Sequence, residues 1–251
     1  MGDEQDMNYE AKRAVILAAG FGSRMVPVTL DRPKPMVRVN GVRIIDTILD
    51  ALLEAGIEDI TIVRGYKKEC FDELLEKYPS LRFIDNDLYD KTNSISSAWA
   101  AINQIKDGCY ICEADLLIVN PEVIRKYHVS SDYLGSYARE TDDWSLEEVD
   151  GRAVNYRKGN TNCFNCYGIS FWTPEDCDKL RRDIESVWHE EGGRDVFYEF
   201  VPLVLRKDNY HVKIHECQKG DVIEIDSFQE LVALDHSYKG YRADNQYNTV
   251  R

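Results

Sequence analysis

Two basic residues follow a short glycine-containing loop near the N-terminus. Glycine lets the backbone approach a ligand closely and turn successive N–H groups toward an anion. Arg24 can bind phosphate oxygens through its planar fork, and Lys34 can neutralise them as a point charge. The spacing therefore predicts a loop that holds the phosphates of a nucleotide. The residues assigned to this loop are Leu17, Ala18, Ala19, Gly20, Phe21, Gly22 and Ser23.

The loop differs from the two common phosphate-binding loops. The dinucleotide fingerprint needs a third glycine at position 25, where this chain has Met25, and a helix directly afterwards. Pro27, Pro33 and Pro35 exclude a regular helix through that span. The P-loop ending Gly-Lys-Ser/Thr is absent. A bare Gly-x-Gly is equally compatible with a turn after an edge strand, but the added arginine and lysine favour phosphate binding.

Carboxylates follow two predicted strands in the middle and at the end of the chain. Asp115 follows the apolar run 110–112, and Asp226 follows the run 222–225. A single aspartate in such a place is more often a helix cap or a solvated loop residue. Two of them beside a phosphate loop predict a Mg²⁺ site, because magnesium prefers oxygen ligands and takes few of them from protein. Glu224, on the same strand face as Asp226, is predicted to contact a second substrate.

The elements that position these residues alternate between strand and helix in the first half of the chain. Such alternation predicts an α/β protein with a parallel sheet and helices on both faces. Ligands of such sheets lie beyond the carboxyl ends of the strands. Asn93 or Ser94 is predicted to cap the third helix. The predicted strands are 14–17, 60–63, 81–84 and 110–114, and the predicted helices are 44–55, 67–78 and 95–105.

The second half is less regular and predicts a more antiparallel region. Its expected strands are 133–138, 154–157, 167–172, 212–215 and 222–225, and its expected helices are 174–188, 196–205 and 228–234. We predict a flexible arm at 1–12, one domain at 13–237 and a polar tail at 238–251. The domain divides into a nucleotide half, about 13–120, and an acceptor half, about 121–237. A homodimer and a second catalytic domain beyond the tail, such as a kinase or a transaminase, are left open.

Composition excludes several classes of partner. The 251 residues include 31 basic and 45 acidic side chains, a net charge of -14, which argues against nucleic acid. No apolar run approaches the roughly 18 residues of a membrane-spanning helix. The N-terminus lacks the pattern of a secretory signal. The odd count of seven cysteines suits a reducing compartment, so we predict a cytoplasmic protein without membrane insertion.

Two Cys-x-x-Cys pairs raise the alternative of a zinc site. They are Cys109 with Cys112 and Cys163 with Cys166. The first pair lies in a predicted strand, where side chains three positions apart point to opposite faces. This alternation favours buried structural cysteines over metal ligands.

Several motifs occur together in an order that resembles the bacterial CTP:phosphocholine cytidylyltransferases, within the sugar-nucleotidyltransferase superfamily. The likeness runs from about 13 to 234. It implies a Rossmann-like nucleotidyltransferase fold with a mixed, mostly parallel central sheet, and Mg²⁺ held by Asp115 and Asp226. It also implies a cytosine pocket formed by the loop backbone with Asn93 and Ser94 nearby. The motifs are LAAGFGSR, Pro33-Lys34-Pro35, Asn93-Ser94-Ile95, Glu113-Ala114-Asp115, Gly168-Ile169-Ser170-Phe171-Trp172 and Glu224-Ile225-Asp226.

The acceptor implied by the family carries a quaternary ammonium group, which should meet aromatic faces and carboxylates. Asp142-Asp143-Trp144 matches the family position whose tryptophan faces choline. Phe197-Tyr198-Glu199, predicted on a helix, departs from the family's Tyr-Trp-Asp. That departure admits a primary amine such as 2-aminoethylphosphonate, and Tyr198 is equally compatible with an ordinary buried aromatic. The acceptor residues we predict are Asp142, Trp144, Tyr198 and Glu224.

The resemblance predicts an enzyme that makes CDP-choline and pyrophosphate from CTP and phosphocholine. Arg24, Lys34 and Asp115 are its predicted catalytic residues, and a small cationic phosphorylated acceptor is its second substrate. The acceptor oxygen attacks the α-phosphorus in line, and catalysis is positioning and charge neutralisation. The alternatives are 2-aminoethylphosphonate as acceptor, a sugar 1-phosphate, which the acidic and aromatic acceptor half disfavours, and a regulatory module that binds nucleotide without chemistry.

Overall fold

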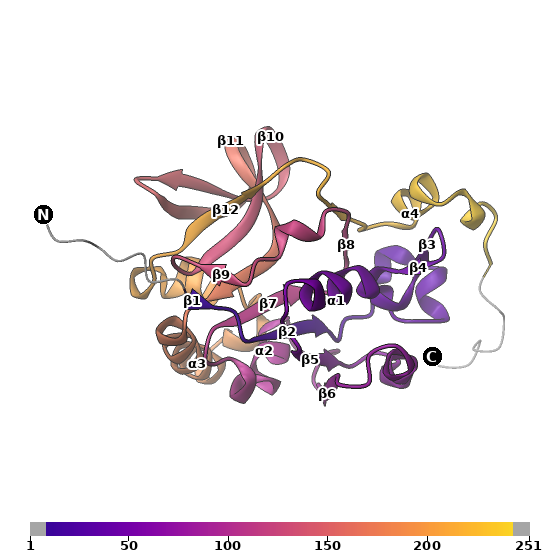
Figure 1. Ribbon diagram of the computed structural model, residues 1–251, viewed down its shortest axis with the longest axis horizontal. Helices are drawn as coiled ribbons and strands as arrows, with labels where there is room; N and C mark the ends of the chain where they lie inside the picture. The colour runs from indigo at the N-terminus through magenta and orange to yellow at the C-terminus, as the bar shows by residue number, and fades with distance from the viewer. Residues whose placement is uncertain (1–8, 243–251) are drawn as a thin grey trace, which may run out of the picture.

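A seven-stranded mixed sheet forms the centre of the molecule (Figure 1). The computed structural model describes residues 9–242. The sheet order is β12-β10-β11-β7-β2-β5-β6. The strands are β2 (Arg13–Ala18), β5 (Asp59–Arg64), β6 (Arg82–Asp85), β7 (Cys109–Glu113), β10 (Asp132–Val149), β11 (Arg152–Trp172) and β12 (Lys213–Cys217).

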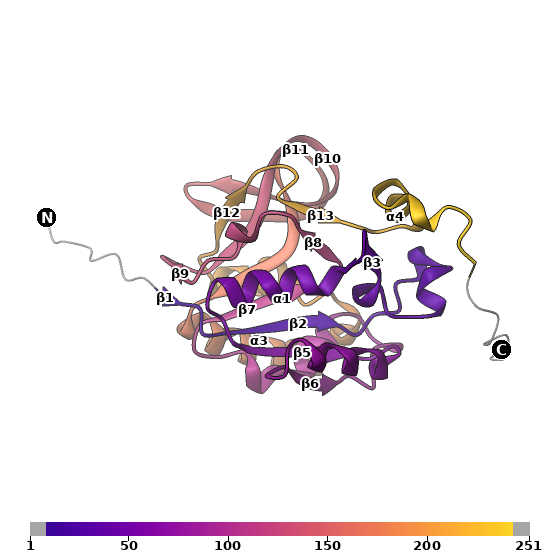
Figure 2. The ribbon, with the colours of Figure 1, turned by 45° about the vertical axis from the view of Figure 1, so that its right-hand side comes forward.

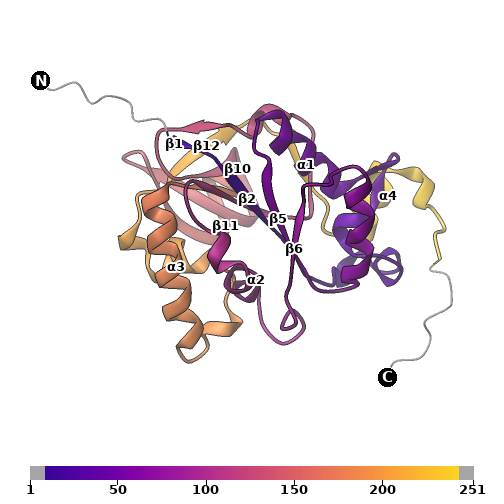
Figure 3. The ribbon, with the colours of Figure 1, turned by 60° about the horizontal axis from the view of Figure 1, so that its bottom comes forward.

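The first half of the chain builds the parallel part of this sheet, as the strand–helix alternation predicts. β2 pairs in parallel with β5 and β7, and β5 with β6. Alternate β2 side chains enter two different cores: Ile16 packs with α1 (Ile44–Glu54), and Leu17 packs with α2 (Ile95–Ala100) and α3 (Pro174–His189). Figure 2 shows α1 and α3 on opposite sides of β2. Figure 3, in which the bottom of the Figure 1 view comes forward, shows α2 and α3 next to each other. The predicted α/β fold with helices on both faces is confirmed.

The second half of the chain forms a long antiparallel ribbon of β10 and β11. β11 also pairs antiparallel with β7, and β12 runs parallel to β10. The separate strands predicted at 154–157 and 167–172 are one strand of 21 residues. Their pairing continues through several register shifts, which bend the ribbon without ending it. Two-stranded pairs complete the fold: β13 (Val222–Glu224) with β8 (Leu116–Ile118), and β3 (Arg38–Val39) with β4 (Val42–Arg43).

Three helix predictions need correction. The stretch 67–78 is a 3₁₀ helix, Lys68–Glu76, and the helix from Ile95 ends at Ala100 before a 3₁₀ turn. In the stretch 196–205 helical structure begins only at Phe200, directly before the π-helix Val201–Leu205. The preceding residues bond instead to the start of α2: Ile95 N–H donates to the Val196 carbonyl, and Tyr198 N–H donates to the Ser94 hydroxyl. These tertiary bonds replace the helical ones that local sequence favours.

Regular structure is described on both sides of the predicted domain, 13–237. The predicted arm includes β1 (Tyr9–Glu10), which pairs with β9 (Tyr127–His128), and the buried Ala11, whose N–H donates to the Lys126 carbonyl. At the other end, α4 (Phe228–Leu234) is followed by Tyr238, whose hydroxyl donates to the Arg38 carbonyl. Residues 1–8 and 243–251, the rest of the predicted arm and tail, lie outside the described residues. In the described range, no helix is long and apolar enough to cross a membrane.

The cysteines of β7 point to opposite faces of the sheet. Cys112 packs in the core under α1, and Cys109 packs in the core under α3. All seven cysteines are free thiols. Burial raises the pKa of Cys112 above its ordinary value, because the thiolate would lose its hydration. The β7 pair therefore cannot share a metal, as the strand alternation predicts.

Candidate active site

The candidate site lies beyond the carboxyl ends of β2 and β7. In the sheet register Leu17 lies opposite Glu113, so the glycine loop and the Glu113-Ala114-Asp115 segment emerge side by side. β8 follows Asp115 and pairs with β13, which ends at Glu224. The Ile225 N–H donates to the Asp115 carbonyl at 3.4 Å. This pairing brings together two aspartates that are 111 positions apart in sequence, Asp115 and Asp226.

The glycine loop folds tightly over Lys34. Gly22 has a positive φ of 67°, and a Cβ atom placed on it would lie 2.9 Å from the Cβ of Lys34. The Thr29 hydroxyl donates to the Gly22 carbonyl at 3.0 Å. Only glycine meets both the conformation and the close approach at this position. The loop is therefore shaped around the lysine predicted to hold the triphosphate.

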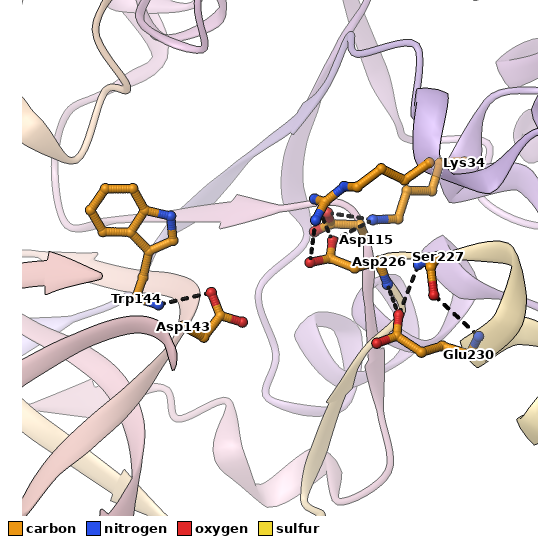
Figure 4. A network of polar contacts seen from close by, with 8 residues as sticks. Lys34, Asp115, Asp143, Trp144, Asp226, Ser227 and Glu230 are labelled. Carbon is orange, nitrogen blue, oxygen red and sulfur yellow. Dashed lines mark hydrogen bonds and ion pairs between the residues drawn. The ribbon is translucent and has the colours of Figure 1, made fainter. Parts of the chain in front are cut away.

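Two basic side chains contact the two aspartates (Figure 4). Lys34 Nζ lies 2.8 Å from Asp115 Oδ2 and 3.2 Å from Asp226 Oδ1. The Arg24 guanidinium donates to both oxygens of Asp226, at 2.8 and 2.9 Å. Burial opposes the charge on Lys34, but the charges and hydrogen bonds of both aspartates outweigh it and raise the lysine pKa. Lys34 is therefore positively charged at the point where the aspartates meet.

Three carboxylates form a cluster that could hold a metal ion. One oxygen from each of Asp115, Glu224 and Asp226 lies within 4.8 Å of the others. Burial, followed by the charges of Asp115 and Asp226, raises the pKa of Glu224 to about 8. All ligand atoms are carboxylate oxygens, which is the donor set of magnesium. The cluster fits such a cation, and Glu224, predicted as an acceptor residue, lies within it.

Two cavities meet at these carboxylates. The nucleotide-side cavity has a volume of about 240 Å³ and the acceptor-side cavity about 230 Å³. Both are lined by Arg24, Glu113, Asp115 and Asp226. A substrate in either cavity can therefore present its reacting group to the same cluster. The other residues of the nucleotide-side cavity are Leu17, Ala18, Gly20, Gly22, Ser23, Lys34, Pro35 and Ala114.

The predicted loop residues Ala19 and Phe21 do not line either cavity. Ala19 is buried, and its carbonyl accepts the Tyr66 N–H at 3.0 Å. The Phe21 ring meets the Tyr66 ring edge-to-face, with the centroids 4.6 Å apart. These residues hold the loop against the rest of the domain, and the remaining five predicted residues line the nucleotide-side cavity.

Asn93 and Ser94 lie away from the nucleotide-side cavity. Ser94 lines the acceptor-side cavity, and its hydroxyl accepts the Tyr198 N–H. The Asn93 side chain donates to the Asp195 carbonyl and accepts the Ser94 N–H. Ser94 occupies the N-cap position of α2, but no side chain caps the helix, and the Ser94 backbone is helical (φ -59°, ψ -20°), whereas a capping residue is usually extended.

An aromatic wall forms part of the acceptor-side cavity. The Trp144 indole stacks on the Tyr156 ring at 5.0 Å, with 14° between their planes. The rings of Phe197 and Phe200 approach Trp144 at steep angles, at 5.8 and 5.6 Å. Trp144, Tyr156 and Phe197 line the cavity. Because Tyr156 covers one face of Trp144, that face cannot also contact a ligand.

Two predicted acceptor residues lie elsewhere. Asp142 is exposed and borders a separate surface hollow, whereas its neighbour Asp143 lines the acceptor-side cavity and accepts the Trp144 N–H. Tyr198 is fully buried, and its hydroxyl lies 2.9 Å from the hydroxyl of Ser170. Because residues 196–199 are not helical, the residues on either side of Tyr198, Phe197 and Glu199, line the cavity instead.

A pair of carboxyl groups, the half-buried Glu113 and the buried Glu199, was not among the predicted site residues. Both line the acceptor-side cavity, and each lies close enough to the other to influence its pKa. Burial is the largest cause that raises the pKa of each, to about 7 for Glu199. Gly168 (φ 62°) packs on Glu113, since a Cβ there would lie 2.6 Å from Glu113 Cγ. The sequence motifs included Glu113, in Glu113-Ala114-Asp115, and Glu199, in Phe197-Tyr198-Glu199. Nothing in these motifs indicated that the two side chains lie close together.

A glycine loop and an acidic cluster lie together at one edge of a mixed sheet, which is the arrangement expected of a nucleotidyltransferase. Residues 14–143 match the family model of the MobA-like NTP transferase domain. The chain therefore belongs to the MobA-like NTP transferase family, and the predicted enzyme class, nucleotidyltransferase, is confirmed.

Two curated relatives match almost the whole chain. One is the 2-aminoethylphosphonate cytidylyltransferase of Lancefieldella rimae, 36% identical over 239 residues, which cover 92% of this chain and 95% of the relative. Another is the choline-phosphate cytidylyltransferase of Streptococcus pneumoniae, 30% identical over 236 residues, which cover 90% and 98%. The resemblance inferred from the motifs is thus confirmed at the level of bacterial cytidylyltransferases.

Solved structures share the fold. The CTP:phosphocholine cytidylyltransferase from Streptococcus pneumoniae superposes with a TM-score of 0.81 at 29% identity, over 90% of this chain and 98% of that one. An inositol-1-phosphate CTP transferase from T. maritima superposes with a TM-score of 0.72 at 18% identity, over 94% of this chain and all of that chain. The second match supports the fold alone.

Proposed function

We propose that this chain is a cytidylyltransferase that transfers CMP from CTP to 2-aminoethylphosphonate and releases pyrophosphate. The observation that carries the choice of acceptor is the acidic wall of the acceptor-side cavity. Asp143, Glu199 and Glu224 line it, and Tyr156 covers one face of Trp144. An ammonium group with N–H donors suits such a wall better than a trimethylammonium group does. Of the two relatives reported above, the more similar one is named a 2-aminoethylphosphonate cytidylyltransferase.

On the nucleotide side, the loop amides and two basic side chains would hold the triphosphate of CTP. Lys34 is buried, with 9% of its side chain exposed, so its charge acts in a region of low dielectric constant. Arg24 is 68% exposed and free to exchange Asp226 for a phosphate oxygen. Both residues would neutralise charge as the bond to pyrophosphate breaks.

The acidic cluster would hold Mg²⁺ through Asp115 and Asp226, with Glu224 as a further oxygen donor. When bound, the ion would neutralise phosphate charge and orient the α-phosphate. Without it, Lys34 and Arg24 are the counter-ions of the two aspartates. In the reaction, a phosphonate oxygen forms a bond to the α-phosphorus while the bond to the pyrophosphate oxygen breaks. The phosphonate is ionised near neutral pH, so the chain needs no general base.

Phosphocholine is the second candidate acceptor, and it is the acceptor that the sequence motifs favour. Trp144 lines the acceptor-side cavity together with Phe197 and Tyr156, and aromatic faces bind quaternary ammonium groups. The choline-phosphate relative from Streptococcus pneumoniae is 30% identical to the chain. Because of these two features, phosphocholine should be tested beside 2-aminoethylphosphonate in any assay.

Pyrophosphate release tests the proposal directly. The purified chain would be mixed with Mg²⁺, one of the four common NTPs, and one acceptor: 2-aminoethylphosphonate, phosphocholine or a sugar 1-phosphate. We expect the highest kcat/KM with CTP and 2-aminoethylphosphonate. A higher kcat/KM with phosphocholine would replace the proposed acceptor, and binding of CTP without turnover on any acceptor would indicate a regulatory module.

A further inference from the structure

One oxygen of Glu199 is buried without a partner. The residue is 4% exposed, and its Oε2 atom has no hydrogen-bond partner among the residues that the structure describes. An unpaired buried carboxylate oxygen costs free energy, and folded proteins rarely leave one without a ligand or water to bond it. Because Glu199 lines the acceptor-side cavity, the missing donor can come from a molecule bound there.

The surroundings of Glu199 favour a cationic donor. Glu113 lies beside the Glu199 carboxyl group, and Asp115 adds negative charge nearby. Burial is the largest cause that raises the pKa of Glu199, to about 7, and a positive charge placed beside it would favour the ionised form. In the described part of the chain, no arginine, lysine or histidine forms a salt bridge with Glu113 or Glu199. The pair thus lacks a counter-ion of its own.

The position of the pair also suits a short acceptor. Glu199 and Asp115 line the same cavity, and the charge of Asp115 acts on the Glu199 carboxyl group. A short acceptor with its ammonium group at Glu199 can therefore present its phosphonate to Asp115.

We propose that Glu199, supported by Glu113, is the specificity-determining residue that accepts an N–H hydrogen bond from the ammonium group of the acceptor. This inference rests on the proposed function, since it assigns a role in binding that enzyme's acceptor. A primary ammonium has three N–H donors, and each N-methyl group removes one. A trimethylammonium group has none and leaves Oε2 unpaired. Sites built to bond an N–H reject analogues that lack it far more strongly than apolar sites reject an added methyl group.

The test is a methylation series of acceptors. The kcat/KM with CTP would be measured for 2-aminoethylphosphonate and its N-methyl, N,N-dimethyl and N,N,N-trimethyl derivatives, in the wild type and in Glu199→Gln. In the wild type we expect kcat/KM to fall along the series, with a loss of about 10–100-fold at the last step, where the final N–H disappears. In Glu199→Gln the amide oxygen can still accept an N–H bond, but without charge assistance. We therefore expect kcat/KM for the primary amine to fall and the loss along the methylation series to shrink to within about 3-fold.

A matched control separates specificity from a structural role. Glu148→Gln makes the same chemical change at an exposed position of β10 outside both cavities. In this variant kcat/KM should depend on methylation as it does in the wild type. If Glu199→Gln lowers kcat/KM for all four acceptors by the same factor, Glu199 has only a structural role and the inference is wrong. A wild type that turns over the trimethyl compound as well as the primary amine contradicts it without any variant, even if Glu199→Gln fails to fold. A wild type inactive with CTP and every acceptor instead overturns the proposed function.

Discussion

The nucleotide side and the acceptor side of the site are built in different ways. The nucleotide side comes from one short stretch, in which the loop around Gly22 folds over Lys34 and the fit depends on the backbone. The acceptor side is assembled from residues of β7, β10, β11 and a turn before the π-helix, including Glu113, Trp144 and Glu199. The first kind of site depends mainly on backbone conformation, and the second depends on individual side chains from several elements. We therefore expect the two sides to respond differently to mutation.

The largest effect is expected where the two sides meet. Asp115→Ala removes one carboxylate of the acidic cluster and one partner of Lys34, so we expect kcat to fall by about 1,000-fold or more. Because the side chain is 28% exposed, the folded state should survive, with a melting temperature close to that of the wild type. The assay is pyrophosphate release at saturating CTP and Mg²⁺. Asp208→Ala, at an exposed position in the 3₁₀ turn Lys207–Asn209, is the control, and near-normal kcat in Asp115→Ala would refute the role of this carboxylate.

The next effect should be confined to the nucleotide side. Gly22→Ala places a methyl group 2.9 Å from Lys34 Cβ and strains a backbone with φ of 67°. Such strain costs about 1–3 kcal/mol, so we expect KM for CTP to rise roughly 10-fold or more while acceptor preference stays unchanged. Gly151→Ala carries the same backbone strain (φ 72°) in a turn with open space around it. If both variants bind CTP equally well, contact with Lys34 does not shape the loop.

A moderate effect is expected on the pH dependence of stability. Burial raises the pKa of Glu199 to about 7, above the ordinary glutamate value near 4.3. Between these values the folded chain holds a proton that the unfolded chain has lost, so this residue makes stability fall as pH rises from about 4.5 to 7 and changes little above that. Glu199→Gln removes the contribution. Denaturant unfolding should show the variant gaining about 1–2 kcal/mol on the wild type between pH 5 and 7.5. A constant difference across that range would contradict this assignment.

The smallest effect is expected at the aromatic wall. Trp144→Phe keeps an aromatic face in the acceptor-side cavity but reduces its area and its stacking on Tyr156. A cation–π contact contributes about 0.5–1 kcal/mol, so KM for the acceptor should rise only about 2–5-fold, with KM for CTP unchanged. A much larger loss of acceptor binding would mean that Trp144, rather than Glu199, dominates recognition and would favour a quaternary ammonium group.

The same contrast explains what the sequence could predict. The loop, β2 and the aspartates after β7 and β13 depend on local patterns, an apolar run followed by glycine or acid, which can be read along the chain. The Glu113–Glu199 pair depends on the turn at 196–199, which is held by hydrogen bonds with Ser94 and Ile95, about a hundred residues earlier. Local helix propensity has no information about such bonds. The sequence therefore predicted a helix here and gave no sign that Phe197 and Glu199, rather than Tyr198, line the cavity.

The central claim is that Asp115 and Asp226, far apart in sequence, share one metal ion on the triphosphate of CTP. Mn²⁺ can replace Mg²⁺, and its binding with CTP can be followed by electron paramagnetic resonance in the wild type, Asp115→Asn and Asp226→Asn. We expect one ion in the acidic cluster of the wild type, with coupling to ³¹P of the nucleotide, and at least 10-fold weaker Mn²⁺ binding in each variant. Unchanged Mn²⁺ affinity and ³¹P coupling in either variant would contradict the claim.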